Sequence, residues 1–366
     1  MQQRERRADR SSFFFVFGAA LLLLAEALLQ GNAYLWGAIA LLGLAFCVAP
    51  NRALPANALS IALGLFCAWL FCGAAFLTPS YSADRLYLPI VLFGAFAVGA
   101  ALSRSALGRL FRAGAVLLAL LVLLGLLQFY FGFWHLAHNP QRAAATFITP
   151  NTFATAINLI LLPLIALTLV RGGSRRAYFL ALWMFAGLLA TESRGGWLAA
   201  LAGFAFIAWY LGVPRTRAGR EPWLRLIAGL LWVFIAFSAA TRLIPLIGLA
   251  LPTSLAGIFD RIGLADTFGE SIVVRGTSYR IDIAKVALGQ IAQWPLAGAG
   301  ANMFRNLMEM NKPIELDIGF TFPYVHNDYL QIWLEFGLVG LALLGAIIVA
   351  ALRLLMKARR ADRDDP

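Results

Sequence analysis

The sequence is poor in charged residues, and especially in acidic ones. Asp, Glu, Lys and Arg make up 13% of its 366 residues, about half the share found in typical soluble domains. Hydrophobic residues make up 61%, and the mean hydropathy is +0.78. Such a composition excludes an ordinary soluble fold and predicts a protein that crosses a membrane several times.

Cysteine and the common nucleotide and metal motifs are also scarce or absent. The three cysteines, Cys47, Cys67 and Cys72, lie in apolar segments, where we expect them to pack as small hydrophobic residues. The sequence has no Walker A loop, no HExxH and no tandem CxxC pair. These absences argue against ATP-driven transport and zinc chemistry, and no cofactor or metal is expected.

Long apolar stretches predict the fold class, because a helix needs about 20 apolar residues to cross the hydrocarbon core. Ten segments meet this requirement: 12–30, 33–49, 56–78, 87–103, 111–134, 152–170, 177–191, 195–213, 224–241 and 328–355. The last is too long for one straight span, so we expect a bend near Gly337 or Gly340. The sequence therefore predicts an all-α polytopic membrane protein with about 10–12 spans. Its expected divisions are a helix bundle at 1–241, an outer loop at 242–323 and a final helix with a basic tail at 324–366.

The distribution of Lys and Arg predicts the orientation. With the N-terminus in the cytoplasm, most of the 30 basic residues fall in short loops on that side. The basic N-terminal segment lacks a small-residue cleavage site, so we expect an uncleaved first helix. Contact with anionic membrane lipids explains the net charge of +12, and no nucleic-acid partner is needed.

Four outward segments hold the candidate functional residues. They contain Arg142 with Thr149-Pro150-Asn151, Arg194 with Gly195-Gly196, Arg275 and Arg280 near a predicted helix at 279–293, and His326-Asn327-Asp328. Some arginines at membrane ends simply reach the interface, and His135 and His138 are typical of loops. His326 stands out because a titratable group at a membrane boundary usually marks function. Arg194 stands out because the glycines after it allow a close backbone approach.

Several arginines and one histidine on the same face fit one kind of chemistry. A planar guanidinium matches phosphate oxygens, so arginines could neutralise a diphosphate leaving group in place of Mg²⁺. Histidine, with an unperturbed pKa of about 6.5, can take a proton from a hydroxyl near neutral pH. Because the outer side has no ATP, the donor must arrive activated, and a lipid-linked diphosphate sugar is the natural candidate.

Four motifs follow one another along residues 140–350. They are Thr149-Pro150-Asn151-Thr152-Phe153-Ala154, Ser193-Arg194-Gly195-Gly196-Trp197-Leu198, Arg280 with Pro295-Leu296 and Gly298-x-Gly300, and His326-Asn327 with Gly337 and Gly340. These resemble the N-P-N-x-F-A, S-R-G-x-W-L, R…P-L-x-G-x-G and H-[N/S/Q]-x9-G-x-x-G patterns of the O-antigen ligase and polymerase superfamily. The resemblance implies a membrane glycosyltransferase with a GT-C-like helical fold.

The resemblance further implies an O-antigen ligase of the bacterial inner membrane, acting in lipopolysaccharide biosynthesis on the periplasmic side. A glycan would pass from undecaprenyl diphosphate to a hydroxyl of lipid A–core. By position, His326 would be the base or its support, and Arg194 and Arg280 would hold the diphosphate. The implied substrate-binding residues are Arg275, Arg142, Asn327, Asp328 and Asn151. We expect inversion at the anomeric carbon, because no pair of outer carboxylates is placed for a covalent route.

Three other functions stay open. An O-antigen polymerase typically shows R-x10-G motifs in two outer loops, and no outward arginine here has glycine at that spacing. A protein O-oligosaccharyltransferase usually carries a large C-terminal outer domain, which this sequence does not show. A membrane transporter, from a different class, would place its polar residues at the midplane and often between repeated halves, and neither pattern is evident.

Overall fold

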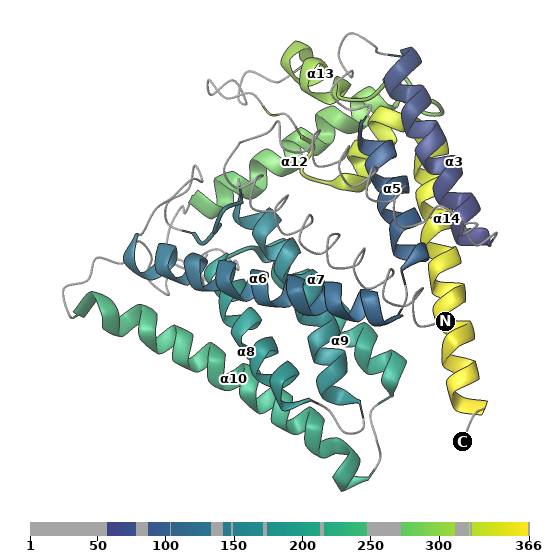
Figure 1. Cartoon of the computed structure of the whole chain (residues 1–366). Coiled ribbons are helices and arrows are strands. Elements are labelled where there is room, and N and C mark those ends of the chain that lie inside the picture. The colour runs from purple at the N-terminus through teal and green to yellow at the C-terminus, as the bar shows by residue number, and fades with distance from the viewer. Residues whose placement is uncertain are drawn as a thin grey trace. The chain divides into compact units, whose positions relative to one another are not determined.

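The described part of the protein is helical, as the sequence predicts (Figure 1). The computed structural model describes residues 57–77, 87–102, 104–132, 142–147, 149–170, 174–212, 216–246, 272–311, 322 and 324–364. Their helices are α3 (Ala58–Cys72), the π-helix η1 (Gly73–Leu77), α5 (Tyr87–Ala101), α6 (Arg104–Phe131), α7 (Pro150–Leu169), α8 (Arg175–Ala190), α9 (Arg194–Leu211), α10 (Arg217–Leu246), α12 (Ile272–Ile291), α13 (Met303–Asn311) and α14 (Asp328–Asp364). No strand occurs within these ranges, which confirms the all-α class.

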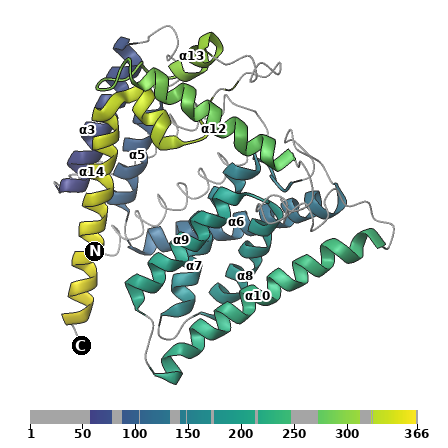
Figure 2. The same ribbon diagram turned by 180° about the vertical axis from the view of Figure 1, so that it is seen from behind.

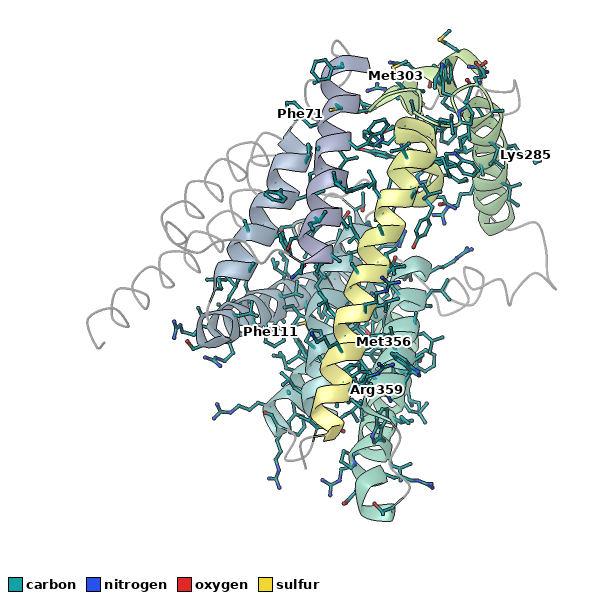
Figure 3. The ribbon with its side chains drawn as sticks, turned by 90° about the vertical axis from the view of Figure 1, so that its right-hand side faces the viewer. Phe71, Phe111, Lys285, Met303, Met356 and Arg359 are labelled. Carbon is teal, nitrogen blue, oxygen red and sulfur yellow. The ribbon has the colours of Figure 1, made fainter. Side chains whose placement is uncertain are left out.

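Six of these helices are long and apolar enough to cross a membrane: Ala58–Phe76, Ser105–Phe131, Pro150–Leu169, Arg194–Leu211, Gly219–Thr241 and Asp328–Arg360. Their outer surfaces are apolar, as lipid contact requires. Phe71 on α3 and Met356 on α14, for example, are 42% and 40% exposed (Figure 3). The protein is therefore a multi-pass membrane protein. The expected spans 12–30 and 33–49 lie outside the described residues, so the full span count stays a prediction.

Two predicted spans form short helices that are not among these six. The stretch 87–103 is α5, with 15 residues, and 177–191 is α8, with 16 residues. At 1.5 Å per residue, each is shorter than the hydrocarbon core is thick. The predicted outer helix at 279–293 is α12, which begins earlier, at Ile272, and ends at Ile291.

The chain forms two compact units, and each is described by itself. One contains α3, η1, α5, α12, α13 and α14, and the other contains α7, α8, α9, α10 and α6 from Gly108 onward. In the first unit α14 packs along α3, and α12 packs against α13 and α14. In the second, α7 lies between α8 and α9, and α10 packs on α8 and α7 (Figure 2). The predicted division at residues 241 and 323 stays a prediction.

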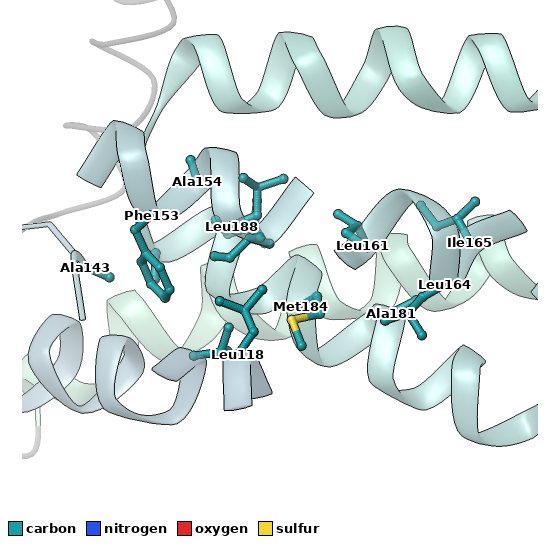
Figure 4. Packing of buried hydrophobic residues seen from close by; sticks show 14 of the residues in the cluster. Leu118, Ala143, Phe153, Ala154, Leu161, Leu164, Ile165, Ala181, Met184 and Leu188 are labelled. Atoms are coloured by element: carbon teal, nitrogen blue, oxygen red, sulfur yellow. The ribbon is translucent and has the colours of Figure 1, made fainter. Parts of the chain in front are cut away.

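The core of the second unit is built on one face of α7. Phe153, Ile157 and Leu161, spaced four residues apart, are completely buried and meet Met184 and Leu188 of α8 (Figure 4). Lipid surrounds such helices with apolar chains, so their association depends on close packing and not on the removal of water. The chain provides that packing with small residues at the helix contacts.

The core of the first unit fixes the segment that precedes α14. Ile283, Ala287 and Ile291 form the buried face of α12, and α13 covers them with Phe304 and Met308. Val325 and Leu334, on either side of the start of α14, complete the same apolar cluster. The residue before His326 is thus anchored in the core that also holds α12.

Candidate functional site

His326 sits in a sharp turn immediately before α14. Its backbone φ is +59°, in the left-handed region that few residues other than glycine adopt. The residue is partly exposed, and neighbouring protein atoms cover the rest of it. A strained backbone at an exposed histidine persists only when its neighbours are held in place.

Asn327 holds the turn on its C-terminal side. Its Oδ1 accepts hydrogen bonds from the N–H groups of Tyr329 and Leu330, at 3.1 and 3.2 Å. This is the bonding of an N-cap residue, and Asp328 then places a carboxylate at the positive end of the helix. The structure therefore gives Asn327 and Asp328 a part in starting α14. Their predicted contact with substrate stays a prediction.

Gln331 holds the turn on its N-terminal side. Its side-chain Oε1 accepts a hydrogen bond of 2.8 Å from the backbone N–H of Val325, which is buried. Its Nε2 donates a hydrogen bond of 2.6 Å to Oε1 of Glu335, one turn further along α14. Glu335 is buried as well. The residues before and after His326 are therefore both bound to α14.

Arg280 of α12 acts on the histidine electrostatically. Partial burial lowers the pKa of His326 below its ordinary value, and the positive charge of Arg280 lowers this pKa further. The neutral imidazole is therefore favoured at neutral pH, which is the form that can accept a proton. The structure thus brings together His326 and Arg280, two of the three residues predicted to be catalytic. Arg275 lies in the same helix, and its side chain is outside what the structure describes.

The predicted bend in the last helix occurs at Gly337. Its φ and ψ are +68° and −173°, so α14 breaks into two halves at this residue. In an unbroken helix, the carbonyls of Leu334 and Glu335 would accept from the N–H groups of Leu338 and Val339. Here both pairs find new partners outside the helix.

Those partners belong to the Pro295–Gly300 loop that follows α12. The N–H groups of Ala299 and Gly300 donate to the carbonyls of Leu334 and Glu335 at 2.7 and 3.0 Å. The N–H groups of Leu338 and Val339 donate to the carbonyls of Pro295 and Leu296 at 2.9 and 3.3 Å. We call these four backbone hydrogen bonds between 295–300 and 334–339 the helix-break clasp. Two motifs that the sequence places far apart are therefore one structural feature.

Glycine is required on both sides of the clasp. A Cβ on Gly337 would lie 2.0 Å from the carbonyl oxygen of Leu296. A Cβ on Gly298, whose φ is +82°, would lie 2.5 Å from the carbonyl of Glu335. Trp69 of α3 completes the arrangement, because its indole N–H donates to the carbonyl of Phe336 at 2.8 Å.

The second unit contains the other predicted group, around the turn between α8 and α9. Nε of Arg142 donates to the carbonyl of Thr191 at 2.8 Å, and Nη2 donates to the carbonyl of Glu192 at 3.0 Å and to Oδ1 of Asn151 at 3.3 Å. The hydroxyl of Ser193 also donates to Oδ1 of Asn151, at 2.8 Å. The guanidinium of Arg142 thus joins two loops, and its predicted role toward substrate stays a prediction.

Arg194 is the first residue of α9 and is half-buried. Ser193 caps this helix by accepting from the N–H of Gly196 at 3.1 Å. A Cβ on Gly196 would lie 2.6 Å from the Cβ of Ala154 in α7, whereas one on Gly195 would meet nothing within 4 Å. The close approach expected from the two glycines therefore occurs at Gly196, and it is helix packing between α9 and α7.

Residues 179–345 match the family model described as O-Antigen ligase. This region of the chain is similar to the O-antigen ligase family. No curated protein matches the chain. The family region contains Arg194, Arg280 and His326 and both sides of the helix-break clasp, so the resemblance predicted from the motifs is confirmed there. Arg142, Asn151 and Trp69 lie before it.

Some residues that shape the two candidate groups were not predicted from the sequence. Gln331 and Glu335 are polar residues four positions apart in an apolar helix, which is a signal that could have found them. Gln128 of α6 is fully buried, and it bonds both N–H groups of Ala144 and Ala145 and the carbonyl of Ala145. This amide fixes the loop that leads from Arg142 to α7. Among the described residues, no three His, Cys, Asp or Glu side chains gather as a metal site would need.

Proposed function

We propose that the protein is an O-antigen ligase of the bacterial inner membrane. It transfers a polysaccharide from undecaprenyl diphosphate to a hydroxyl of lipid A–core on the periplasmic face. The family match at 179–345 supports the class of reaction. The proposal places the active site at His326 because partial burial and the charge of Arg280 lower the pKa of this histidine and favour its neutral form.

The proposed reaction uses His326 as the base. Its imidazole takes the proton of the acceptor hydroxyl while the acceptor oxygen forms a bond to the anomeric carbon. The bond between that carbon and the diphosphate oxygen breaks, and its electron pair leaves with undecaprenyl diphosphate. Attack from the side opposite the leaving group inverts the anomeric centre.

The arginines neutralise the leaving group in this proposal. The departing diphosphate gains negative charge, and a guanidinium offers a fixed positive charge with two donors directed at phosphate oxygens. Arg280 supplies this charge next to the base, and Arg194 supplies it at the start of α9, where the helix dipole also favours an anion. Arg275 and Arg142 assist them. With these charges the transfer needs no metal ion.

A reconstituted assay tests the proposal. Purified protein is mixed with undecaprenyl-diphosphate glycan and lipid A–core, with EDTA and without nucleotide. We expect glycan on lipid A–core, with a rate at least about 100-fold lower for His326→Ala and a similar loss for Arg280→Ala. Arg305→Ala, which removes another exposed arginine of the same unit, is the matched control and should keep the wild-type rate.

Each other outcome points to a different function. Glycan chains that lengthen on the lipid carrier would identify a polymerase. Transfer to a protein hydroxyl would identify a protein O-oligosaccharyltransferase. A folded protein that moves glycan to no hydroxyl acceptor would contradict the enzyme assignment and favour a transporter.

A further inference from the structure

The turn at His326 is connected to the helix-break clasp by two side chains. Gln331 is bonded at both ends, to the N–H of Val325 and to the carboxyl of Glu335. Glu335 in turn belongs to the clasp, since its backbone carbonyl accepts from Gly300. Through Glu335 and Gln331, hydrogen bonds thus connect the clasp to the backbone N–H of Val325, the residue before His326.

We propose that Gln331 and Glu335 are positioning residues that hold the His326 turn in register with α12, the helix that carries Arg280. This inference rests on the proposed function of His326. Neither residue touches the reacting atoms in this proposal. Their effect passes through the backbone of Val325, whose N–H is buried and therefore needs an acceptor.

The clasp explains why this connection matters for Arg280. The Pro295–Gly300 loop directly continues the end of α12, so the backbone bonds of the clasp fix the first half of α14 relative to α12. Gln331 transfers that fixed position to the turn. On the other side, Asn327 is bound to the same half-helix. The left-handed backbone of His326 therefore has an anchored residue before it and after it.

Substitutions can distinguish an effect on the position of the His326 turn from an effect of the charge of Glu335. Gln331→Met has a similar shape but loses both hydrogen bonds, and Glu335→Leu removes the acceptor of Gln331. Glu335→Gln keeps an oxygen in that place without the carboxylate. Gln293→Met makes the same chemical change as Gln331→Met, at an exposed residue of the same unit whose amide bonds only to Gln290 in the described contacts. It serves as the matched control.

The first readout is transfer in the reconstituted assay. We expect Gln331→Met and Glu335→Leu to lower kcat roughly 10- to 100-fold, because a displacement of about 1 Å at a reacting group can cost 100-fold. KM for the lipid-linked donor should stay near its wild-type value. Glu335→Gln should recover most of the lost turnover, and Gln293→Met should equal the wild type.

The second readout does not need activity. Diethyl pyrocarbonate acylates only neutral imidazole, so the pH dependence of its reaction at His326, followed by peptide mass spectrometry, gives the midpoint of His326 titration. In Gln331→Met and Glu335→Leu the His326 turn is no longer held in place, so the titration midpoint of His326 should shift toward the ordinary value for histidine. Glu335→Gln should keep the wild-type midpoint, and His135 and His138 provide internal references in every sample.

The two readouts distinguish failure of this inference from failure of the proposed function. Wild-type kcat and midpoint in folded Gln331→Met and Glu335→Leu would overturn the positioning role while leaving His326 as the base. A midpoint that falls in Glu335→Gln would also overturn it, because Glu335 would then act by its charge. If no variant or wild type transfers glycan, yet the midpoints move as expected, the positioning role stands and the proposed reaction fails.

Discussion

Gly337→Ala is the sharpest test of the helix-break clasp, because the structure leaves no room for the new methyl group. At φ +68° and ψ −173°, the backbone lies in a region that is essentially restricted to glycine, and a residue with a side chain pays on the order of 1–3 kcal/mol to adopt it. The added Cβ would also lie 2.0 Å from the carbonyl oxygen of Leu296 and 2.6 Å from the carbonyl carbon of Ala297. Both neighbours are backbone atoms that are themselves hydrogen-bonded or adjacent to a bonded group.

Relief of that overlap requires the loop to move away from α14. Overpacking of this kind typically costs about 1–3 kcal/mol, so strain and overlap together give a loss of roughly 2–6 kcal/mol. Gly345→Ala in the same helix is the matched control, since its Cβ would meet nothing within 4 Å. That change should be neutral or stabilising by up to about 1 kcal/mol, because alanine is the better helix former.

Thermal unfolding in detergent, followed by tryptophan fluorescence, compares the two variants with the wild type. We expect a clearly lower Tm for Gly337→Ala and an unchanged or slightly higher Tm for Gly345→Ala. Equal stability of the two variants would refute the reasoning, because it would mean that the loop 295–300 does not press against the break.

Three further predictions follow from other described contacts. Trp69→Phe removes the indole donor to the carbonyl of Phe336, together with part of a ring that packs in the same apolar cluster, and should cost at least about 1 kcal/mol; an unchanged Tm would contradict this. Transfer should decline as the pH falls below 6.5 and passes through the lowered pKa of His326, because the protonated imidazole cannot act as a base. In Arg280→Gln the titration midpoint of His326, measured by diethyl pyrocarbonate, should rise because a positive charge is removed. A midpoint that falls would show that Arg280 does not lower this pKa. Gln128→Leu leaves three buried backbone groups at 144–145 without their partner and should cost roughly 2–4 kcal/mol in the same unfolding assay, whereas a loss below 1 kcal/mol would imply that another group replaces the amide.

The membrane helices of the described chain were predictable because their signal is local. A span needs a run of apolar residues, and hydropathy finds such runs without knowledge of the partners. The break in α14 was predictable for a similar reason, since an apolar segment too long for one span contained glycines near its start. Only the structure decides that the break is at Gly337 and that Gly340 lies within the second half.

The site was less predictable because its contacts connect distant parts of the sequence. His326 and Arg280 could be proposed from residue type and motif. The left-handed turn and the effect of Arg280 on the pKa of the histidine could not be predicted from the sequence. Arg142 shows the limit most clearly. The sequence suggested that Arg142 binds phosphate. In the structure its hydrogen-bond acceptors include backbone carbonyls about 50 residues away, and such carbonyls carry no sequence signal.

The helix-break clasp gives a structural meaning to two of the family patterns, the one with Pro295, Leu296, Gly298 and Gly300 and the one with His326, Asn327, Gly337 and Gly340. The fixed glycines Gly298, Gly300 and Gly337 of the two patterns lie in a break of the backbone that is held mainly by N–H and C=O groups, which nearly every residue possesses. Gln331 and Glu335 fall among the nine positions that the second pattern leaves unspecified. Two proteins could therefore share the patterns, and the break, while differing in how firmly the histidine turn is held. Comparison at those unspecified positions would be the better guide to whether a related protein works at the same rate.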